Sequence, residues 1–288
     1  MKVDITNSHL MPRNILEIGG GGNNYKKVAV VCPVHPPKFD FLRNCIHSFC
    51  KCGLNFSADF WIVFSNFEDA LKFGDFEKFL IVPENINLST RGIINIKKLW
   101  AVSKLSKMGY DYVITIDADF TFNRTVDLVK ICDRFFAEKI IISCITDYEL
   151  FLNINEQCLS RFAHNPKSKN IPVNLYSWLN QPCIYKADTV KKFFVALGNL
   201  DLNQLTWYDF DYILYTYYLI LYEDFQQYLM PNWSPKLYPF GETWTLPENF
   251  SLKAVKGVHF LICSKRLYFW IQQNYPDNEI MMITHLDR

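Results

Sequence analysis

Short apolar runs alternate with longer stretches of helical spacing over residues 27–145. Each run is four or five residues long, which is the length of a buried strand. The apolar runs are 28–31, 60–64, 79–82, 112–116 and 140–144, and the helical stretches are 39–49, 93–108 and 126–136. Strands and helices in this alternation form a mainly parallel sheet with helices on both faces. The sequence therefore predicts a Rossmann-like α/β fold.

The pattern is less regular after residue 150. The polar, Asn-rich stretch 154–176 predicts a long loop, and the Trp-, Pro- and Gly-rich stretch 230–249 predicts another. Further strands are expected at 182–185 and 254–262, and further helices at 188–196, 208–225 and 265–273. Residues 27–150 and 151–288 are expected to be two halves of a single large domain, behind a flexible leader at 1–26.

Charge and cysteine usage narrow the classes of function. The 30 basic and 29 acidic residues nearly cancel, which gives no whole-chain attraction to nucleic acid. The nine cysteines are odd in number and mostly scattered through apolar stretches, which is typical of a reduced, cytoplasmic protein. No apolar run reaches the roughly 18 residues of a spanning helix. The apolar segment 212–222 is expected to be a buried helix, with peripheral contact at the inner face of a membrane as the alternative.

Two carboxylates directly follow the apolar run at 112–116. Asp117 and Asp119 are separated by one small residue, Ala118. Ligands of a doubly wound sheet bind beyond the carboxyl ends of its strands, and hard oxygen ligands suit Mg²⁺ or Mn²⁺. The pattern predicts a metal site that binds a diphosphate. The alternative is that the two acids begin a turn and cap the helix after Thr121.

The segment around these acids resembles the metal-binding segment of glycosyltransferases with the GT-A fold. It covers residues 112–122, YVITIDADFTF. The nearest pattern is that of the family that includes glycogenin and the bacterial lipopolysaccharide galactosyltransferases. The resemblance implies Mn²⁺ or Mg²⁺ on Asp117 and Asp119, with Asp117 also contacting the donor. It further implies that residues 27–150 bind a nucleotide sugar and that residues 151–288 bind the acceptor.

Two segments in the second half resemble the donor-sugar segments of the same family. LNQPCI at 179–184 carries Asn180, whose counterpart in the family faces the donor sugar. WYDFDYIL at 207–214 carries Asp209 and Asp211 at the positions of two family aspartates, the first of which binds donor-sugar hydroxyls. Phe210 stands where the family has a catalytic-face glutamine. Asp209 could instead complement the dipole at the start of the following helix.

A third segment, VHFLICSK at 258–265, resembles the family's metal- and diphosphate-binding segment. The resemblance implies that His259 is the third metal ligand and that Lys265, six residues later, contacts the diphosphate. The spacing matches the family, whereas its glycine position is Ile262 here. A histidine at the end of an apolar strand is otherwise expected to be a core residue.

Further donor contacts are expected from the family's architecture. In GT-A proteins the loop after the first strand holds the nucleoside, which implies that Val34 and His35 contact the nucleoside here. The alternative is that this Pro-rich segment only forms a turn. The helix before the acids carries Lys97 and Lys98, of which Lys97 is taken as a donor contact and at least one is expected to be a solvated surface residue. Asp147 is a candidate for the donor-sugar hydroxyls, and the loop 233–244 is a candidate for the acceptor pocket.

Together these patterns predict a metal-dependent glycosyltransferase. The expected donor is a nucleoside-diphosphate sugar, with UDP first, and the acceptor is a hydroxyl of a glycan or glycolipid. The frequent Asn, Lys, Ile and Phe suggest an AT-rich genome, and the expected source is a bacterium that builds surface polysaccharide. Retention of the anomeric configuration is preferred over inversion, for which Asp209 or Asp211 would be the base. The alternatives are a nucleotidyltransferase acting on a sugar phosphate and a non-catalytic binding protein of the GT-A type.

Overall fold

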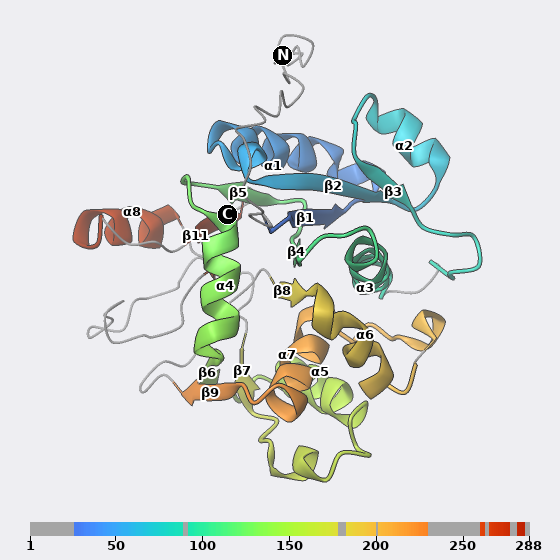
Figure 1. Ribbon diagram of the computed structural model, residues 1–288, viewed down its shortest axis with the longest axis vertical. Coiled ribbons are helices and arrows are strands. Elements are labelled where there is room, and N and C mark those ends of the chain that lie inside the picture. Colours follow the sequence, from blue (N-terminus) through green and yellow to red (C-terminus); the bar gives the residue numbers. More distant parts are fainter. Residues whose placement is uncertain are drawn as a thin grey trace, which may run out of the picture.

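A five-stranded mixed sheet in the order β3-β2-β1-β4-β8 forms the centre of an α/β domain (Figure 1). The computed structural model describes residues 26–88, 92–177, 183–199, 201–229, 260–262, 265–276 and 281–285. The strands of the central sheet are β1 (Val28–Pro33), β2 (Ala58–Phe64), β3 (Phe79–Ile81), β4 (Tyr112–Thr115) and β8 (Cys183–Lys186). The predicted Rossmann-like α/β fold with a mainly parallel sheet is confirmed.

The centre of the sheet is buried on both faces. β1 pairs in parallel with β2 and with β4, so that Val28 lies opposite both Ala58 and Tyr112. Every residue of β1 and of β4 is buried, as expected for strands between two helical layers. β8 adds to the free side of β4 in the antiparallel direction. The runs predicted as strands at 28–31, 60–64, 79–82, 112–116 and 182–185 are confirmed.

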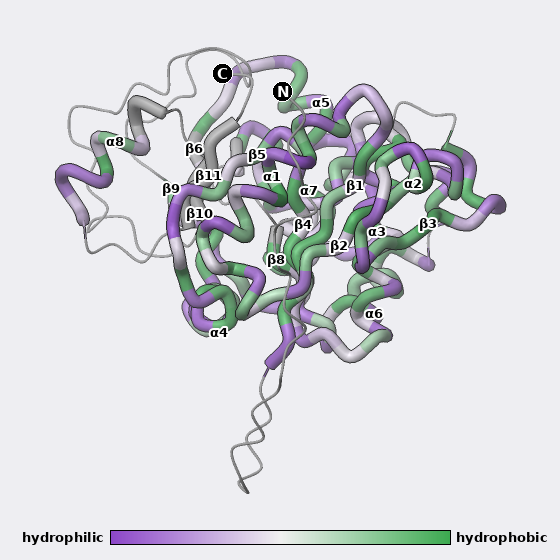
Figure 2. Tube along the Cα trace, turned by 90° about the horizontal axis from the view of Figure 1, so that it is seen from above, coloured by the Kyte–Doolittle hydropathy of each residue, from purple (hydrophilic) through white to green (hydrophobic). Residues whose placement is uncertain are grey.

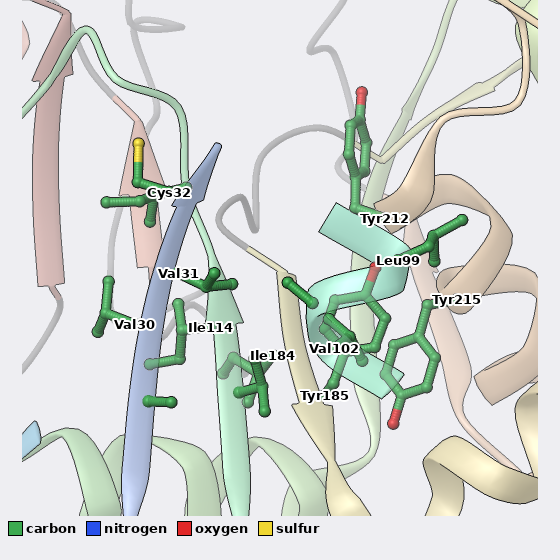
Figure 3. Packing of buried hydrophobic residues seen from close by; sticks show 14 of the residues in the cluster. Val30, Val31, Cys32, Leu99, Val102, Ile114, Ile184, Tyr185, Tyr212 and Tyr215 are labelled. Carbon is green, nitrogen blue, oxygen red and sulfur yellow. The ribbon is translucent and has the colours of Figure 1, made fainter. Parts of the chain in front are cut away.

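Helices cover both faces of the sheet. Figure 1 shows α1 and α2 on one side and α3 on the other, with α6 and α7 packed beyond α3. In Figure 3, Leu99 and Val102 of α3 lie beside the apolar side chains of β4 and β8. The helices are α1 (Phe39–Lys51), α2 (Phe67–Phe73), α3 (Ile93–Ser106), α4 (Leu128–Glu138), α5 (Glu149–Ser160), α6 (Ala187–Ala196), α7 (Asp211–Tyr222) and α8 (Lys265–Asn274).

Two small sheets flank the central one. One has the order β10-β11-β5 and the other β7-β6-β9. The run at 140–144 was expected to extend the central sheet, but β6 belongs to the second small sheet because β8 already pairs with β4 along its free side. The strands of these sheets are β5 (Phe120–Phe122), β10 (Phe260–Ile262), β11 (Met281–His285), β6 (Ile140–Ile145), β7 (Leu175–Tyr176) and β9 (Gln226–Leu229).

The prediction of a long loop at 154–176 is wrong. This stretch contains most of α5, a 3₁₀ helix at Pro166–Asn170 and β7. The apolar side chains of α5 are buried on one face, and Asn155 is buried with them. Its amide donates hydrogen bonds to the carbonyls of Val173 and Leu175, at 2.7 and 2.6 Å. Asparagine therefore ties the helix to the returning chain here, whereas its frequency suggested a loop.

Other expectations are met in part. The helix expected at 208–225 is α7, which begins only at Asp211, and β9 follows it. The helices expected at 188–196 and 265–273 are α6 and α8. Of the strand expected at 254–262, only β10 belongs to the described residues. The leader up to residue 25 and the loop 230–249 lie outside them.

Hydropathy follows the layers of the fold. In Figure 2 the hydrophobic positions gather along the central strands β1 and β2, and hydrophilic positions follow the outer turns and the ends of the outer helices. Within the described ranges, no helix has both the length and the apolar character that crossing a membrane requires.

Gly92, at the start of α3, permits a close approach between α3 and the segment before α7. A Cβ atom at Gly92 would lie 2.7 Å from the carbonyl oxygen of Thr206. We expect Gly92→Ala to lower the free energy of unfolding by about 1–3 kcal/mol, because one backbone must move away from the other. Lys104→Ala, at an exposed position of the same helix, serves as the control and should change it by less than about 0.5 kcal/mol. Equal denaturant midpoints for the two variants would contradict the close approach.

Candidate functional site

A buried cation lies between two carboxylates at the carboxyl end of β4. The ammonium of Lys98 is 2.8 Å from Oδ1 of Asp117 and 3.7 Å from Oδ1 of Asp211. The Lys98 side chain is 7% exposed and that of Asp211 is 0% exposed, whereas that of Asp117 is 41% exposed. We call these three residues the acid cluster. It joins a buried charge to a carboxylate that solvent can reach.

Three elements bring the acid cluster together. α3 runs antiparallel to β4, so Lys98 in its first half lies at the carboxyl edge of the sheet, where Asp117 follows β4. Asp211 is the first residue of α7. Its Oδ2 accepts hydrogen bonds from the hydroxyls of Thr115 and Tyr185, both at 3.0 Å. Strands β4 and β8 therefore fix the orientation of the Asp211 carboxylate.

Burial and the neighbouring opposite charges shift the pKa values of Asp211 and Lys98 in opposite directions. Burial, aided by the charge of Asp117, raises the pKa of Asp211, although Lys98 and the two hydroxyls counter part of the effect. Burial by itself would lower the pKa of Lys98, but the carboxylates of Asp117 and Asp211 outweigh it and hold the pKa above its usual value. Lys98 therefore stays positively charged at neutral pH.

Asp119 lies at the turn that leads from β4 into β5. Ala118 is buried, and Oδ1 of Asp119 is shielded from solvent. β5 follows at once and pairs with β11. The alternative in which Asp117 and Asp119 cap the next helix is wrong, because α4 begins only at Leu128. Its N-cap is Asp127, whose side chain accepts a hydrogen bond from the backbone N–H of Lys130.

Lys97 points to the loop after β1 and not to the acids. It is fully buried, and its ammonium donates a 2.7 Å hydrogen bond to the carbonyl of Val34. Burial lowers the pKa of Lys97 to about 8, and Asp69 counters part of that shift. The expectation of a solvated surface lysine is wrong for both Lys97 and Lys98. α3 lies between the sheet and two other helices, so Lys97 and Lys98 are covered, whereas Lys104 near the end of the helix is exposed.

The structure places the two predicted nucleoside contacts at the start of this loop. Val34 is buried, and His35 is exposed directly before a 3₁₀ helix at Pro36–Lys38. Partial loss of solvent around the ring, together with the charges of Lys97 and Lys38, lowers the pKa of His35. This shift favours the neutral imidazole at the carboxyl end of β1, the strand next to β4.

Asp209 has partners that the sequence did not suggest. Its carboxylate is 0% exposed and accepts two hydrogen bonds from Arg161, both 2.8 Å long. The backbone N–H and the hydroxyl of Thr206 also donate to it, at 2.7 and 2.9 Å. Burial would raise the pKa of Asp209, but the hydrogen bonds from Arg161 and Thr206 outweigh it and lower the pKa below its usual value. Asp209 thus holds the segment before α7, whereas the sequence suggested a role with the substrate.

The other predicted site residues either lie in other parts of the fold or fall outside the described residues. Asp147 is exposed in the segment after β6, in the part of the fold that the second small sheet builds. Lys265 is the first residue of α8. Asn180, His259 and the loop 233–244 lie outside the described residues.

The carboxylates at this edge are the kind of ligand that a hard divalent cation prefers, but two of them are too few to form a complete metal site. Asp117 and Asp119 supply carboxylate oxygens at the carboxyl edge, which are the ligands that Mg²⁺ and Mn²⁺ prefer. Among the residues whose positions are described, no group of three His, Cys, Asp or Glu side chains is arranged to hold a metal. The implied third ligand, His259, is not one of those residues.

Sequence reasoning missed the residues that organise the site from behind. The sequence did not single out Thr115, Tyr185 or Arg161 as site residues, because they lie 26 to 96 residues from the acids that they contact. Lys97 was taken as the donor contact, but it is Lys98 that contacts Asp117. Neighbouring residues on a helix point about 100° apart, and the sequence alone could not decide which of the two faces the acids. No protein-family model matches the chain, and no curated protein matches it either.

The Arg161–Asp209 pair makes a prediction about stability. Arg161→Met leaves a buried carboxylate without its cation, and we expect the free energy of unfolding at pH 7 to fall by about 3–5 kcal/mol. Asp209 has a lowered pKa in the folded state, so its stabilisation is present above its unfolded pKa of about 3.9 and is lost as the pH falls through the folded value. Urea denaturation should therefore show the deficit shrinking below about pH 4.

Arg134→Met provides the control for this prediction. Arg134 pairs with Glu138 on an exposed face of α4 at 3.6 Å, and losing such a pair costs less than about 1 kcal/mol. Equal destabilisation by the two variants, or a deficit in Arg161→Met that does not depend on pH, would show that the buried pair does not stabilise the fold.

Proposed function

We propose that the protein is a metal-dependent glycosyltransferase that uses a nucleoside-diphosphate sugar, with UDP as the first choice of nucleotide. The observation that carries the proposal is the acid cluster, in which buried Lys98 ties Asp117 to Asp211 at the carboxyl edge of a Rossmann-like sheet. Ligands of such sheets bind beyond this edge. The resemblance of segments 112–122 and 207–214 to those of GT-A glycosyltransferases supports the same conclusion.

Asp117 and Asp119 are the residues that would hold Mn²⁺ or Mg²⁺, with His259 as the implied third ligand. The metal would supply neutralisation of the charge that develops on the leaving diphosphate. Lys98 holds Asp117 through one oxygen, at 2.8 Å, so the position of this carboxylate is set before any ligand binds. Such preorganisation means that binding need not order the side chain.

The nucleoside is assigned to the loop after β1. Lys97 fixes the carbonyl of Val34, and His35 is the exposed residue next to it. A neutral imidazole can both donate and accept a hydrogen bond, which suits a ribose or a base edge. Lys265 remains the proposed diphosphate contact, and Asp147 and Asn180 remain proposed contacts of the donor sugar.

The burial of Asp209 and Asp211 supports retention over inversion. An inverting transferase needs a carboxylate that reaches the acceptor hydroxyl. Both of these side chains are 0% exposed, and Asp209 is engaged by Arg161. The leaving phosphate is then the preferred base. Asp211 acts by holding Lys98 and through it Asp117. The proposed acceptor is a glycan or glycolipid hydroxyl at the cytoplasmic face of a membrane.

Nucleotide binding tests the proposal directly. Thermal unfolding with UDP-, GDP-, CMP- and dTDP-sugars, each with and without Mn²⁺, should show stabilisation by one nucleotide only when the metal is present. A ligand at a hundred times its Kd adds about 2.7 kcal/mol, which corresponds to a rise in Tm of several degrees. Asp119→Ala should abolish the rise, since it removes a proposed metal ligand.

Asp75→Ala is the matched control for Asp119→Ala. Asp75 is an exposed aspartate in the turn after α2, and its replacement should leave the nucleotide-dependent rise in Tm unchanged. Absence of any response to all four nucleotides in the wild-type protein would overturn the proposed function. A full response in Asp119→Ala would move the metal site away from this turn.

A further inference from the structure

A shallow depression lies between α6 and the end of α7. It has a volume of about 550 Å³. α7 begins in the acid cluster and ends beside the depression, so its 12 residues separate the two by roughly 17 Å at 1.5 Å per residue. The depression is therefore separate from the acid cluster, and a role for it does not depend on the proposed function. Its lining residues are Lys191, Lys192, Val195, Ala196, Tyr218, Tyr222 and Glu223.

The wall of the depression is mainly apolar and partly open to solvent. Val195 is 55% exposed and Tyr222 is 39% exposed. The Tyr222 ring stacks on the ring of buried Tyr218, with 5.5 Å between centroids. Tyr222 thus has a supported inner face and an outer face that meets water. Tyrosine with one apolar and one wet side is the kind of residue that lies at membrane interfaces.

Two basic side chains of α6 line this apolar wall. Lys191 and Lys192 are exposed on α6, and within the described part of the chain neither forms an ion pair. On the other side, the Tyr222 hydroxyl is 3.1 Å from Nε2 of His164. That contact ties α7 to the turn before the 3₁₀ helix at 166–170, which carries exposed Lys167 and Lys169.

The acidic groups nearby are fewer and partly engaged. The carboxylate of Glu223 accepts a 2.7 Å hydrogen bond from the Tyr218 hydroxyl. Asp188 lies 3.8 Å from Lys186 at the start of α6, and exposed Asp224 follows Glu223. Among the residues that line the depression, Lys191 and Lys192 stand against the single carboxylate of Glu223, so the lining has a positive excess in a chain whose net charge is only +1.

We propose that this face, which we call the α6–α7 surface and define by Lys191, Lys192, Val195 and Tyr222, docks on a bilayer that contains anionic phospholipid. The ammonium groups would reach lipid phosphates, while Val195 and Tyr222 would lie at the level of the headgroups. An anionic bilayer fits this surface because it offers both kinds of contact. Its lipid phosphates complement the exposed lysines, and its headgroup region accepts the exposed apolar side chains.

Vesicle sedimentation tests the proposal on the whole chain. At low salt the protein should pellet with vesicles of phosphatidylcholine that contain 30% phosphatidylglycerol, and should stay in the supernatant with phosphatidylcholine alone. Lys191→Glu with Lys192→Glu should lower the partition coefficient by at least about tenfold, because each lysine near the surface contributes roughly a fivefold factor. Binding by the wild type should also weaken as salt increases, since screening acts on exposed charges.

Lys51→Glu with Lys72→Glu is the matched control. It changes the net charge by the same amount, but at exposed positions of α1 and α2, on the other side of the sheet (Figure 1). This pair should keep most of the binding. Val195→Asp tests the contribution of the apolar side chains. This variant should bind the anionic vesicles more weakly than the wild type at a salt concentration at which the wild type still binds. Far-UV circular dichroism melts check that all variants fold.

Three results would overturn the proposal. The first is the absence of pelleting with the anionic vesicles. The second is an equal loss of binding in the control pair, which would indicate a response to net charge and not to this surface. The third is unchanged binding in both Lys191→Glu with Lys192→Glu and Val195→Asp. None of these outcomes bears on nucleotide binding, so the proposed function stands or falls separately.

Discussion

The ion pairs of Lys98 are the interaction on which the site depends. One ammonium group joins Asp117, which follows a central strand, to Asp211, which begins α7. Burying the charges of Lys98 and Asp211 is costly unless they are compensated, so the elements that carry them and Asp117 must meet in one arrangement. The hydroxyls of Thr115 and Tyr185 complete that arrangement on the far side of Asp211. The same contacts that hold α7 to the sheet therefore also set the carboxylate that faces solvent.

The segment that leads into α7 is held by a second buried charge pair. Arg161 at the end of α5 clamps Asp209 through two nitrogen atoms, and Gly92 lets the start of α3 lie against Thr206. Bidentate pairs of this kind restrict both distance and orientation. The position of Asp211, two residues after Asp209, is thereby determined from α5, α3 and the sheet together. Asp209 is therefore a structural residue that is engaged by Arg161, whereas Asp211 is the one of the two that contacts the acid cluster through Lys98.

The molecule also separates two kinds of surface. The carboxyl edge of the central sheet carries the acid cluster and the loop with Val34 and His35, which suits a charged, polar ligand. The far end of α7 carries an apolar wall flanked by lysines. α7 spans the distance between them and is buried along most of its length, which makes it a rigid connection. A bilayer at the α6–α7 surface would lie against the same helix that carries Asp211 of the acid cluster at its other end.

The sequence by itself determined the fold class, five of the central strands and the place of Asp117 and Asp119, because strand runs, helix spacing and a motif after a strand are local patterns. It did not determine that 154–176 contains a helix, since Asn155 is stabilised there by contacts with Val173 and Leu175 that local composition does not encode. Nor did it distinguish Lys97 from Lys98, or the structural partner of Asp209 from a substrate. Only the tertiary structure decided these points, because the buried charges pair with residues at least 19 positions away in the chain, and the role of each charge depends on which partner lies within reach.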